Sequence, residues 1–385
     1  MNKDGNISHI ENATGEKTLK VQCVNSKNEV LGEYEYTIVT NNYSKLPPTI
    51  NKYESSEERI EGEITENKTM QVLYYLICND DTTLVFTGLD RNGSITTNEN
   101  EIVSYMVGDG STTDGNALKE KEILCILDIP EKHNEKPVDK IGGYAFTRAQ
   151  NLIKLKIEDS IKTIDQYFAF AYTNITEATI GKNVSNIGQY TFHGCKKLEK
   201  VVFGNNIEQY GNIFGEAYNW KYIELKEDNS YYKVEDNILY SSDGKKLILV
   251  PTGRTGEFNI PESVEEIKGN AFYTSGIKKV IMRNNVKKIV PYFAFGNSLE
   301  EVIIGENLET ISGYAFYDSR KLQTVIIESS KISRQLNSKA ASGNLLNYAE
   351  TIYIKSDITE IGSYITDNYN IVGTDKEGYV KYVKK

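Results

Sequence analysis

The chain has few of the residues on which catalytic and metal centres depend. Its 385 residues include only three histidines, His9, His133 and His193, and none has a second histidine at metal-ligand spacing or a serine in a nucleophile-elbow context. Walker and Rossmann glycine patterns are also absent. His193 lies two residues before Cys195, but alternation within a repeat would place both by packing. The sequence therefore favours a protein that is not an enzyme and binds neither metal nor cofactor.

Cysteine is also scarce. The four cysteines, Cys23, Cys78, Cys125 and Cys195, are too few and too scattered for a disulfide framework or a zinc site. A disulfide between Cys23 and Cys78 stays open, because both lie on expected strands of one small domain. Two acidic runs, at 79–81 and 109–114, offer oxygen ligands of the kind that calcium prefers, although solvated turns are the simpler interpretation.

Long apolar runs and an excess of positive charge are missing as well. No run approaches the 18 apolar residues of a membrane span, and the opening Met-Asn-Lys-Asp-Gly lacks the apolar core of a signal peptide. A formal net charge of −10 argues against nonspecific nucleic-acid binding. We expect no nucleic-acid partner, no direct membrane insertion, and either a cytoplasmic chain or a fragment of a secreted precursor.

What the chain does have is a phenylalanine that returns at intervals close to 23 residues. A period of 20–29 residues is typical of a solenoid, whose coils stack to share one core. An isoleucine precedes most of these phenylalanines by five or six residues, as Ile141 precedes Phe146. The recurring positions are Phe146, Phe170, Phe192, Phe214, Phe272, Phe295 and Phe316.

Downstream of each phenylalanine, apolar and variable residues alternate, as in Leu299, Val302 and Ile304. Alternation with a period of two is the pattern of a strand. Strands stacked in register would form a parallel sheet with a rise of about 4.8 Å per coil. The sequence thus predicts a mainly β fold, a leucine-rich-repeat solenoid with coils of about 23 residues.

These phrases resemble the BspA-like leucine-rich repeats of bacterial surface proteins, which follow the form L-x-x-I-x-I-P-x-x-V-x-x-I-G-x-x-A-F-x-x-C-x-x-L. The nearest copies are at 183–198 and 307–316, and the resemblance covers roughly residues 100 to 385. It implies a buried Cys195 beside its phenylalanine. It also implies attachment to extracellular-matrix proteins or to other bacteria.

The first 80 residues do not follow the period. Short strands are expected at 20–24, 32–36, 52–54, Gly62 and 70–76, separated by Asn, Lys, Gly and a Pro47-Pro48 pair. Their outline resembles the MucBP-type β-grasp modules of Gram-positive surface proteins, which implies a spacer or a mucin-facing unit. The residues that carry this likeness are Gly32, Tyr34, Tyr53, Val72 and Tyr74.

The expected organisation has five parts. We predict a disordered or extended tail at 1–14, a small β domain at 15–79, a linker and N-terminal cap at 80–140, repeats at 141–373 and a C-terminal capping helix at 374–385. The repeats are interrupted near 228–260 by a hairpin that turns at Ser242-Asp243-Gly244. Residues 328–350 are expected to form a degenerate coil.

The alternation also predicts which side chains leave the sheet outward. From Val202 onward these are mostly apolar and flanked by Lys and Glu, and an exposed stripe of this kind usually marks a partner site. Two alternatives remain, because β-branched residues are favoured in strands for packing alone and a hairpin could cover the stripe. The predicted binding stripe is Val202, Tyr222, Glu224, Lys279, Ile281, Glu301, Ile303, Thr324, Ile326 and Tyr353.

Together these features favour a non-catalytic interaction or adhesion protein at the cell surface or secreted. It would act as a monomer and bind an extracellular protein or glycan, of host or bacterial origin, through the solenoid face. The alternative is a structural or substrate-recruiting fragment of a larger surface enzyme.

Overall fold

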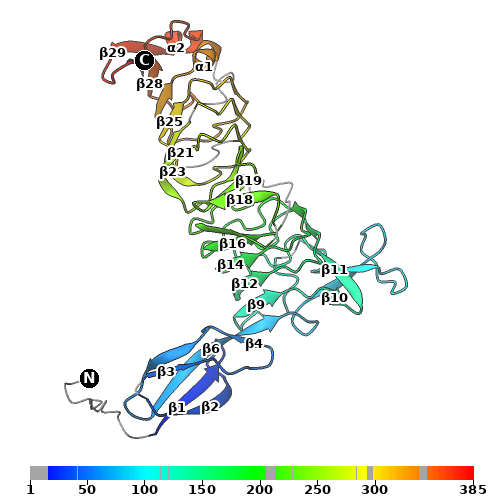
Figure 1. Ribbon diagram of the computed structural model, residues 1–385. Helices are drawn as coiled ribbons and strands as arrows, with labels where there is room; N and C mark the ends of the chain where they lie inside the picture. The colour runs from blue at the N-terminus through cyan, green and yellow to red at the C-terminus, as the bar shows by residue number, and fades with distance from the viewer. Residues whose placement is uncertain are drawn as a thin grey trace, which may run out of the picture.

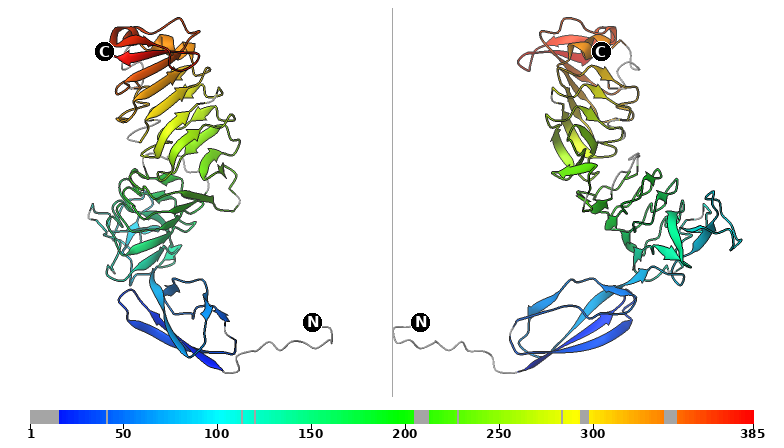
Figure 2. Two further views of the ribbon diagram at one scale, coloured as in Figure 1. Left: turned by 90° about the vertical axis from the view of Figure 1, so that its left-hand side faces the viewer. Right: turned by 45° about the vertical axis from the view of Figure 1, so that its right-hand side comes forward.

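The computed structural model describes residues 16–40, 42–112, 114–119, 121–204, 213–227, 229–282, 284–292, 298–337 and 345–385. The expected tail at 1–14 and Phe295 lie outside these residues. Strands dominate, and they form a small β unit near the N-terminus followed by an elongated, curved solenoid (Figures 1 and 2). The solenoid has about nine turns with coils of about 23 residues, so the predicted fold class is confirmed.

The N-terminal unit contains the strands expected from the sequence, including one at Gly62, and one short strand, at 42–45, that we did not predict. They are β1 (Lys17–Val24), β2 (Val30–Ile38), β3 (Asn42–Lys45), β4 (Tyr53–Ser55), β5 (Ile60–Glu63) and β6 (Lys68–Cys78). Alternation in β1 and β6 buries Leu19, Val21, Val72 and Tyr74 in a core of their own. The arrangement of these strands does not by itself confirm the β-grasp likeness, which stays a prediction.

Strand β6 joins the N-terminal unit to the solenoid. It pairs with β1 along its first half, and further along Leu76 pairs in parallel with Cys125 of β9 (Cys125–Asp128). One sheet therefore runs from β2 through β6 into the coils. The segment expected as a linker also contributes strands, so repeat strands begin at β9 and not at residue 141. A shared strand should restrict hinge motion between the two units.

In the first half, the coils contribute strands to this sheet and to a second sheet across the core. The first sheet continues from β9 through β12 (Leu152–Lys156), β14 (Glu177–Thr179) and β16 (Lys200–Phe203) to β17 (Tyr222–Leu225). The opposite sheet comprises β7 (Phe86–Leu89), β8 (Ser104–Val107), β11 (Lys136–Ile141), β13 (Thr163–Ile164) and β15 (Asn186–Ile187), with β10 (Lys132–His133) beside β11.

The predicted hairpin insertion divides the solenoid. Strands β18 (Tyr232–Glu235), β19 (Ile238–Ser241) and β20 (Lys246–Leu249) form an antiparallel meander. The predicted turn is present, because the Gly244 N–H donates to the Ser241 carbonyl at 2.8 Å and Gly244 has a φ of 73°. The predicted end of the insertion at 260 is wrong, since β21 (Thr255–Asn259) is already a repeat strand that pairs in parallel with the next coil.

A new sheet, called here the second-half sheet, begins at β21. It continues through β23 (Gly276–Ile281), β25 (Glu301–Ile304), β27 (Thr324–Ile327), β28 (Thr351–Lys355), β30 (Tyr379–Lys384) and β29 (Tyr369–Gly373). Across the core, β22 (Glu266–Ile267), β24 (Lys288–Ile289) and β26 (Thr310–Ile311) stack on β20. The two halves have separate hydrophobic cores that meet at the insertion.

The recurring phenylalanines form the spine of the core, as the period predicts. All six that the structure describes are buried, and the rings of Phe146, Phe170, Phe192 and Phe214 stack with centroid separations of 5.1, 5.5 and 5.3 Å. Residues two before and two after these phenylalanines repeatedly adopt a positive φ, as Tyr144 and Arg148 do at 58° around Phe146. Left-handed backbone is costly for such residues, so we did not expect it from their types.

The C-terminal end differs from the prediction. Helices α1 (Ser330–Gln335) and α2 (Ser363–Asn368) are short, and neither falls at 374–385. The segment expected as a capping helix instead contains β30, which pairs antiparallel with β28 on one side and β29 on the other. Its Tyr-Val-Lys-Tyr-Val-Lys sequence suits a strand, and pairing satisfies the backbone groups at the edge of β28. No helix among the described residues is long and apolar enough to cross a membrane.

Candidate functional site on the second-half sheet

The second-half sheet has an outer face whose side chains point away from the core, in the register that the sequence predicts. Val280, Val302 and Val325 point inward and are fully buried. The residues between them form two outer rows across the strands. The first row is Glu257, Lys279, Glu301, Thr324 and Thr351, and the second is Asn259, Ile281, Ile303, Ile326 and Tyr353.

The first row is a ladder of charges. Lys279 Nζ lies 3.4 Å from Glu257 Oε2 and 3.1 Å from Glu301 Oε1. Its hydrogen bond with Glu301 is the main cause that raises the pKa of Lys279. Exposed ion pairs of this kind add little stability, typically about 0–1 kcal/mol each. Their effect is to give the face a polar border beside the second row.

The second row is apolar at its centre, but its exposure is uneven. Ile281 and Ile303 are half-buried, whereas Ile326 is only 2% exposed. Ile326 is nevertheless absent from the core cluster that contains its neighbours Val325 and Ile327. It therefore lies on the predicted outer face, but the prediction that it is accessible is wrong.

Ile326 lies next to the strands that close the sheet, β28 and then the C-terminal hairpin formed by β29 and β30. Tyr353 is its neighbour in the register, and Lys381 of β30 pairs opposite Tyr353. Glu328 follows Ile326 by two residues, and its Oε1 accepts a hydrogen bond from the hydroxyl of Tyr379 in β30 at 2.5 Å. The register therefore places large side chains of β28 and β30 next to this isoleucine. The low exposure of Ile326 is what the alternative of a covering hairpin predicts at this position.

The first three residues of the predicted stripe lie elsewhere. Val202, Tyr222 and Glu224 belong to β16 and β17, which end the first sheet, so the insertion separates them from the second-half sheet. Tyr222 is 52% exposed, and Glu224 pairs with Lys200 at 2.8 Å. The structure brings together Lys279, Ile281, Glu301, Ile303, Thr324, Ile326 and Tyr353 on one face, but the ten residues do not form a continuous stripe.

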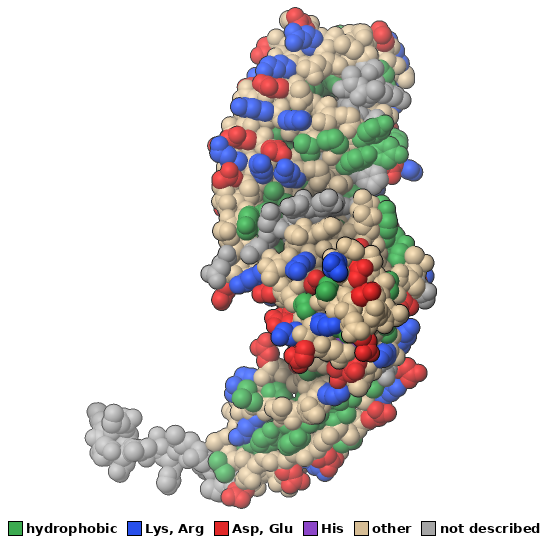
Figure 3. Space-filling model, turned by 90° about the vertical axis from the view of Figure 1, so that its right-hand side faces the viewer, with side chains coloured by type: hydrophobic (Ala, Val, Ile, Leu, Met, Phe, Trp, Pro, Cys, Tyr) green, Lys and Arg blue, Asp and Glu red, His purple; other side chains and the backbone are tan. Residues whose placement is uncertain are grey.

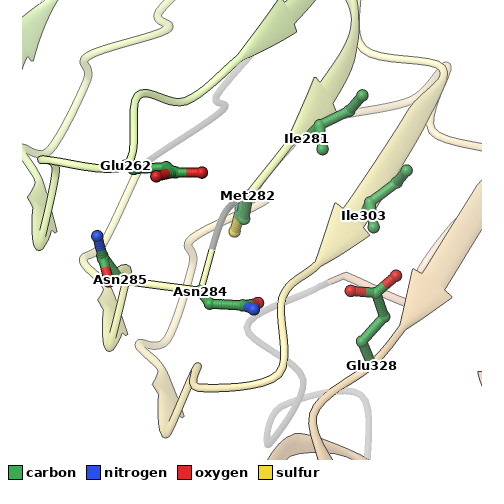
Figure 4. Close-up of a pocket in the computed structure, with 7 residues that line it drawn as sticks. All are labelled: Glu262, Ile281, Met282, Asn284, Asn285, Ile303 and Glu328. Atoms are coloured by element: carbon green, nitrogen blue, oxygen red, sulfur yellow. The ribbon is translucent and has the colours of Figure 1, made fainter.

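A hollow of about 450 Å³ opens where β23 and β25 end (Figure 4). The half-buried Ile281 and Ile303 line it together with residues from the turns that follow the strands. Its lining is Glu262, Ile281, Met282, Asn284, Asn285, Ile303 and Glu328. Sequence reasoning missed the turn residues because it followed only the strand alternation. A comparison, from coil to coil, of the residues just after each strand could have found these turn residues.

Tyr379 holds Glu328 at the rim of this hollow. Burial and the hydrogen bond to the Glu328 carboxylate raise the pKa of Tyr379 to about 12. The phenol is therefore a proton donor throughout the physiological range, and Glu328 is the acceptor. On the opposite side, Figure 4 shows the Glu262 carboxylate extending toward the strand of Ile281. The hollow thus combines an apolar floor with two carboxylates.

The other predicted chemistries find no assembled centre. In the described ranges, no three His, Cys, Asp or Glu residues are placed to hold a metal. In the first acidic run, Asp80 accepts hydrogen bonds from Thr82 and, at 2.9 Å, from Lys52 Nζ, and these lower its pKa. Thr113 of the second run lies among the residues that are not described. Asp80 is therefore engaged by its own neighbours.

The histidine and cysteine near the spine are placed by packing. Cys195 Sγ donates to the Phe170 carbonyl at 3.2 Å, and burial raises the pKa of this thiol to about 11. His193 packs edge-on against the rings of Tyr172 and Tyr190, and burial lowers its pKa. All four cysteines are buried, and Cys23 and Cys78 are free thiols, so no disulfide joins these two.

The remaining surface has mixed charge. Figure 3 shows the opposite side of the molecule, where side chains of both signs lie next to one another along the solenoid. Lys245 and Glu265 pair at 2.9 Å, and Lys268 and Glu266 at 3.0 Å.

Stacked coils, a shared aromatic spine and an extended outer face together define a leucine-rich-repeat β-solenoid.

The chain belongs to the family of the BspA type leucine rich repeat region. The family model matches six copies over residues 125–245 and 253–346, more than half of the chain. The short interval between the two matches, residues 246–252, contains β20 and ends just before the second-half sheet begins at β21. The resemblance stated from the sequence is confirmed for the repeats.

Several solved structures are similar to this chain at low identity. A leucine rich cell surface protein from Faecalibacterium prausnitzii is 21% identical, with 61% of this chain and 62% of that chain covered and a TM-score of 0.36. For the pneumococcal vaccine antigen PcpA the identity is 16%, the coverage 76% and 77%, and the TM-score 0.39. A leucine-rich repeat protein from Bacteroides ovatus is 18% identical, with 68% and 73% covered and a TM-score of 0.34. This chain thus spans less than two thirds of the F. prausnitzii protein. No curated protein matches it.

Proposed function

We propose that this chain is a non-catalytic interaction or adhesion protein, at the cell surface or secreted, that binds an extracellular protein or glycan as a monomer. Its binding surface is the outer face of the second-half sheet around Ile281 and Ile303. The repeat family and the description of one similar structure as a cell surface protein support the setting. The solenoid supports the mode of action, since extended faces are what repeat proteins use to bind.

One observation carries the choice of surface. Ile281 and Ile303 are neighbours in register on an outer face, and both are half-buried, not fully covered, beside a hollow of about 450 Å³. Their neighbour Ile326 is also an outer isoleucine, but only 2% of it is exposed. Accessible apolar side chains bordered by charges are a common feature of partner sites.

The test is a binding screen of the purified chain against matrix proteins, mucins and a glycan array. The Ile281→Glu/Ile303→Glu double variant should lose at least about tenfold in affinity for any ligand found, because each new carboxylate would be desolvated in the interface. Ile95→Glu is the matched control. Ile95 is 54% exposed in the N-terminal cap, far along the chain from this face.

Three outcomes are informative. A ligand lost in the double variant and kept in the control would support both the function and the face. A ligand bound equally by all three proteins would move the binding surface elsewhere. Failure to bind anything at micromolar concentrations would contradict the proposal and favour a structural or recruiting segment of a larger surface enzyme.

A further inference from the structure

The sheet of the N-terminal unit is interrupted beside β6. Strand β4 pairs with the end of β6 that lies nearest the solenoid, where Ser55 is opposite Tyr74 (Figure 1). One more backbone bond follows, from the Ser56 N–H to the Leu73 carbonyl at 2.8 Å, and the chain then leaves β6. Strand β5 pairs with β3 and not with β6. Among the described residues, this edge of β6 therefore has no partner strand over 68–72.

The backbone of β6 presents hydrogen-bonding groups to the vacant position. Residues two apart on a strand direct their N–H and C=O groups to the same edge. The Leu73 carbonyl and the Ile77 N–H both bond on the β4 side. Thr69 and Gln71 therefore direct their backbone groups to that side as well. No group in the described part of the chain bonds to them there, so this edge is open to a further strand.

A groove of about 670 Å³ occupies the vacant position. One wall is formed by residues 70–72 of β6, and the other by the segment 56–61, which leads from β4 into β5. Val72 and Ile60 belong to the core of the unit, and Met70 packs against it, so one side of the groove is apolar. All lining residues lie within the described ranges. Along 68–72 there is room for about five residues of an extended strand, roughly 17 Å in length.

The wall opposite β6 is acidic. The segment 56–61 carries three glutamates and one arginine. Arg59 Nε lies 3.2 Å from Glu61 Oε1, so the arginine is engaged by one of the three. Glu57 and Glu58 are exposed, and neither forms an ion pair with any residue that the structure describes. Two carboxylates at the groove thus lack a cation, which favours a basic occupant and disfavours a second copy of this acidic chain.

We propose that this groove binds an extended basic segment of a partner protein as an added strand. The segment runs antiparallel to β6, in the line that β4 leaves, and exchanges backbone hydrogen bonds with Thr69 and Gln71. Strand addition of this kind takes its affinity from main-chain bonds and its specificity from alternate side chains. The inference goes beyond the proposed function, because the groove lies on the N-terminal unit and involves no residue of the second-half sheet.

The alternation of β6 fixes the pattern of the partner segment. Residues directly opposite each other in an antiparallel pair share one face of the sheet. Gln71 is exposed on the outer face, whereas Met70 and Val72 face the core. The partner residues that bond to β6 therefore have their side chains on the outer face, and the residues between them lie toward the core. Lysine or arginine suits the outer positions, where a long side chain reaches Glu57 and Glu58, and valine suits the others.

The experiment uses the full chain and a capped peptide, labelled with a fluorophore, in which lysines alternate with valines. Binding is followed by fluorescence polarisation, and saturable binding is expected. Methylation of the backbone nitrogens of the lysines removes the donors that face β6, and should lower the affinity at least about tenfold. The matched peptide, methylated at its valines, has the same charge and keeps those donors, so it should bind as the parent peptide does.

Protein variants test the acidic wall and the open edge separately. Glu57→Gln/Glu58→Gln should bind the peptide about tenfold more weakly, because both unpaired carboxylates are removed. Glu350→Gln/Glu377→Gln is the matched control, since it removes the same charge from exposed positions far along the chain. Gln71→Pro removes the N–H that faces the groove and should abolish binding, while the pairing of β6 with β1 does not use that group. Thermal unfolding verifies that each variant keeps the fold.

Several results would overturn the inference. Equal affinity of the two methylated peptides would show that the segment does not pair as a strand. Equal affinity of the acidic-wall variant and its control would show that the two carboxylates are not recognised. A dimer of the chain that the peptide dissociates would mean that a second copy occupies the groove. Residues 1–15 lie outside the described ranges, and binding only by a chain without them would mean that the chain's own N-terminal segment fills the groove.

Discussion

Replacing Phe192 by alanine tests the spine of the solenoid. Its side chain is fully buried between two parallel rings, 5.5 Å from Phe170 and 5.3 Å from Phe214. Removing a buried phenylalanine costs about 3–5 kcal/mol through lost transfer energy and the cavity that remains. The two ring pairs place this position at the upper end, since each is worth about 0.5–1.5 kcal/mol beyond the area buried.

The assay is chemical denaturation followed by far-ultraviolet circular dichroism and by fluorescence of Trp220, the only tryptophan. Trp220 stacks on Phe214 at 4.1 Å, so its emission reports on the same half as the substitution. Because coils in a solenoid stabilise mainly their neighbours, the first half should unfold before the second in the variant. The two signals should then separate, and Trp220 should respond first.

The control is Ile303→Glu, which should change the free energy of unfolding by about 0.5 kcal/mol or less because the side chain faces outward. A variant of Phe192 that loses less than about 1 kcal/mol would refute the argument from cavity formation. If Ile303→Glu were the more damaging change, the assignment of inner and outer faces would be shifted by one residue.

The remaining predictions concern burial and charge. Ile326→Glu should destabilise the fold by about 3 kcal/mol or more, because it places a carboxylate at a buried position beside the C-terminal hairpin. A melting temperature equal to that of Ile303→Glu would show that Ile326 is not covered. Burial alone would raise the pKa of Asp159, but hydrogen bonds from Lys226 and the Lys182 N–H lower it overall. Folding therefore favours ionised Asp159, and this contribution, at most about 1 kcal/mol, is present above the unfolded pKa of about 4 and lost below it. In the Asp159→Asn variant, the free energy of unfolding measured in urea should depend less on pH in that acid range. A pH profile equal to that of the unaltered chain would exclude the ion pair with Lys226 as the source of this dependence. Cys195 should not react with a thiol reagent in the native state, because it is buried with a pKa of about 11, and should react after denaturation; rapid labelling of the folded chain would disprove this.

The fold was largely predictable because repetition multiplies a weak signal. A single Val-x-Ile triplet says little about structure, but its return at a constant distance from the phenylalanine specifies a coil and its inner face. The inner residues Val280 and Val302 and the outer residues Ile281 and Ile303 fall where the alternation places them. Local pattern was enough, since every coil repeats the same contacts with the next coil.

Where repetition stops, local pattern failed. The segment at 374–385 was predicted as a helix, but β30 pairs with β28 because the last parallel strand offers an unpaired edge. The tyrosines at positive φ were unexpected for a similar reason. Their backbone cost is offset by hydrogen bonds to the next coil, as when the Tyr144 N–H donates to the Tyr167 carbonyl at 3.1 Å.

The sequence by itself determined the coil length, the buried spine and the side of the sheet on which each residue lies, because these depend on contacts that recur every coil. Only the tertiary structure decided that the sheet divides at the insertion, that Ile326 is covered, and that Glu262 and Glu328 share a hollow with Ile281 and Ile303. These features depend on residues that meet once, across several coils or at the end of the stack. No periodic signal marks such meetings, and their energies depend on packing that forms only when the chain is folded.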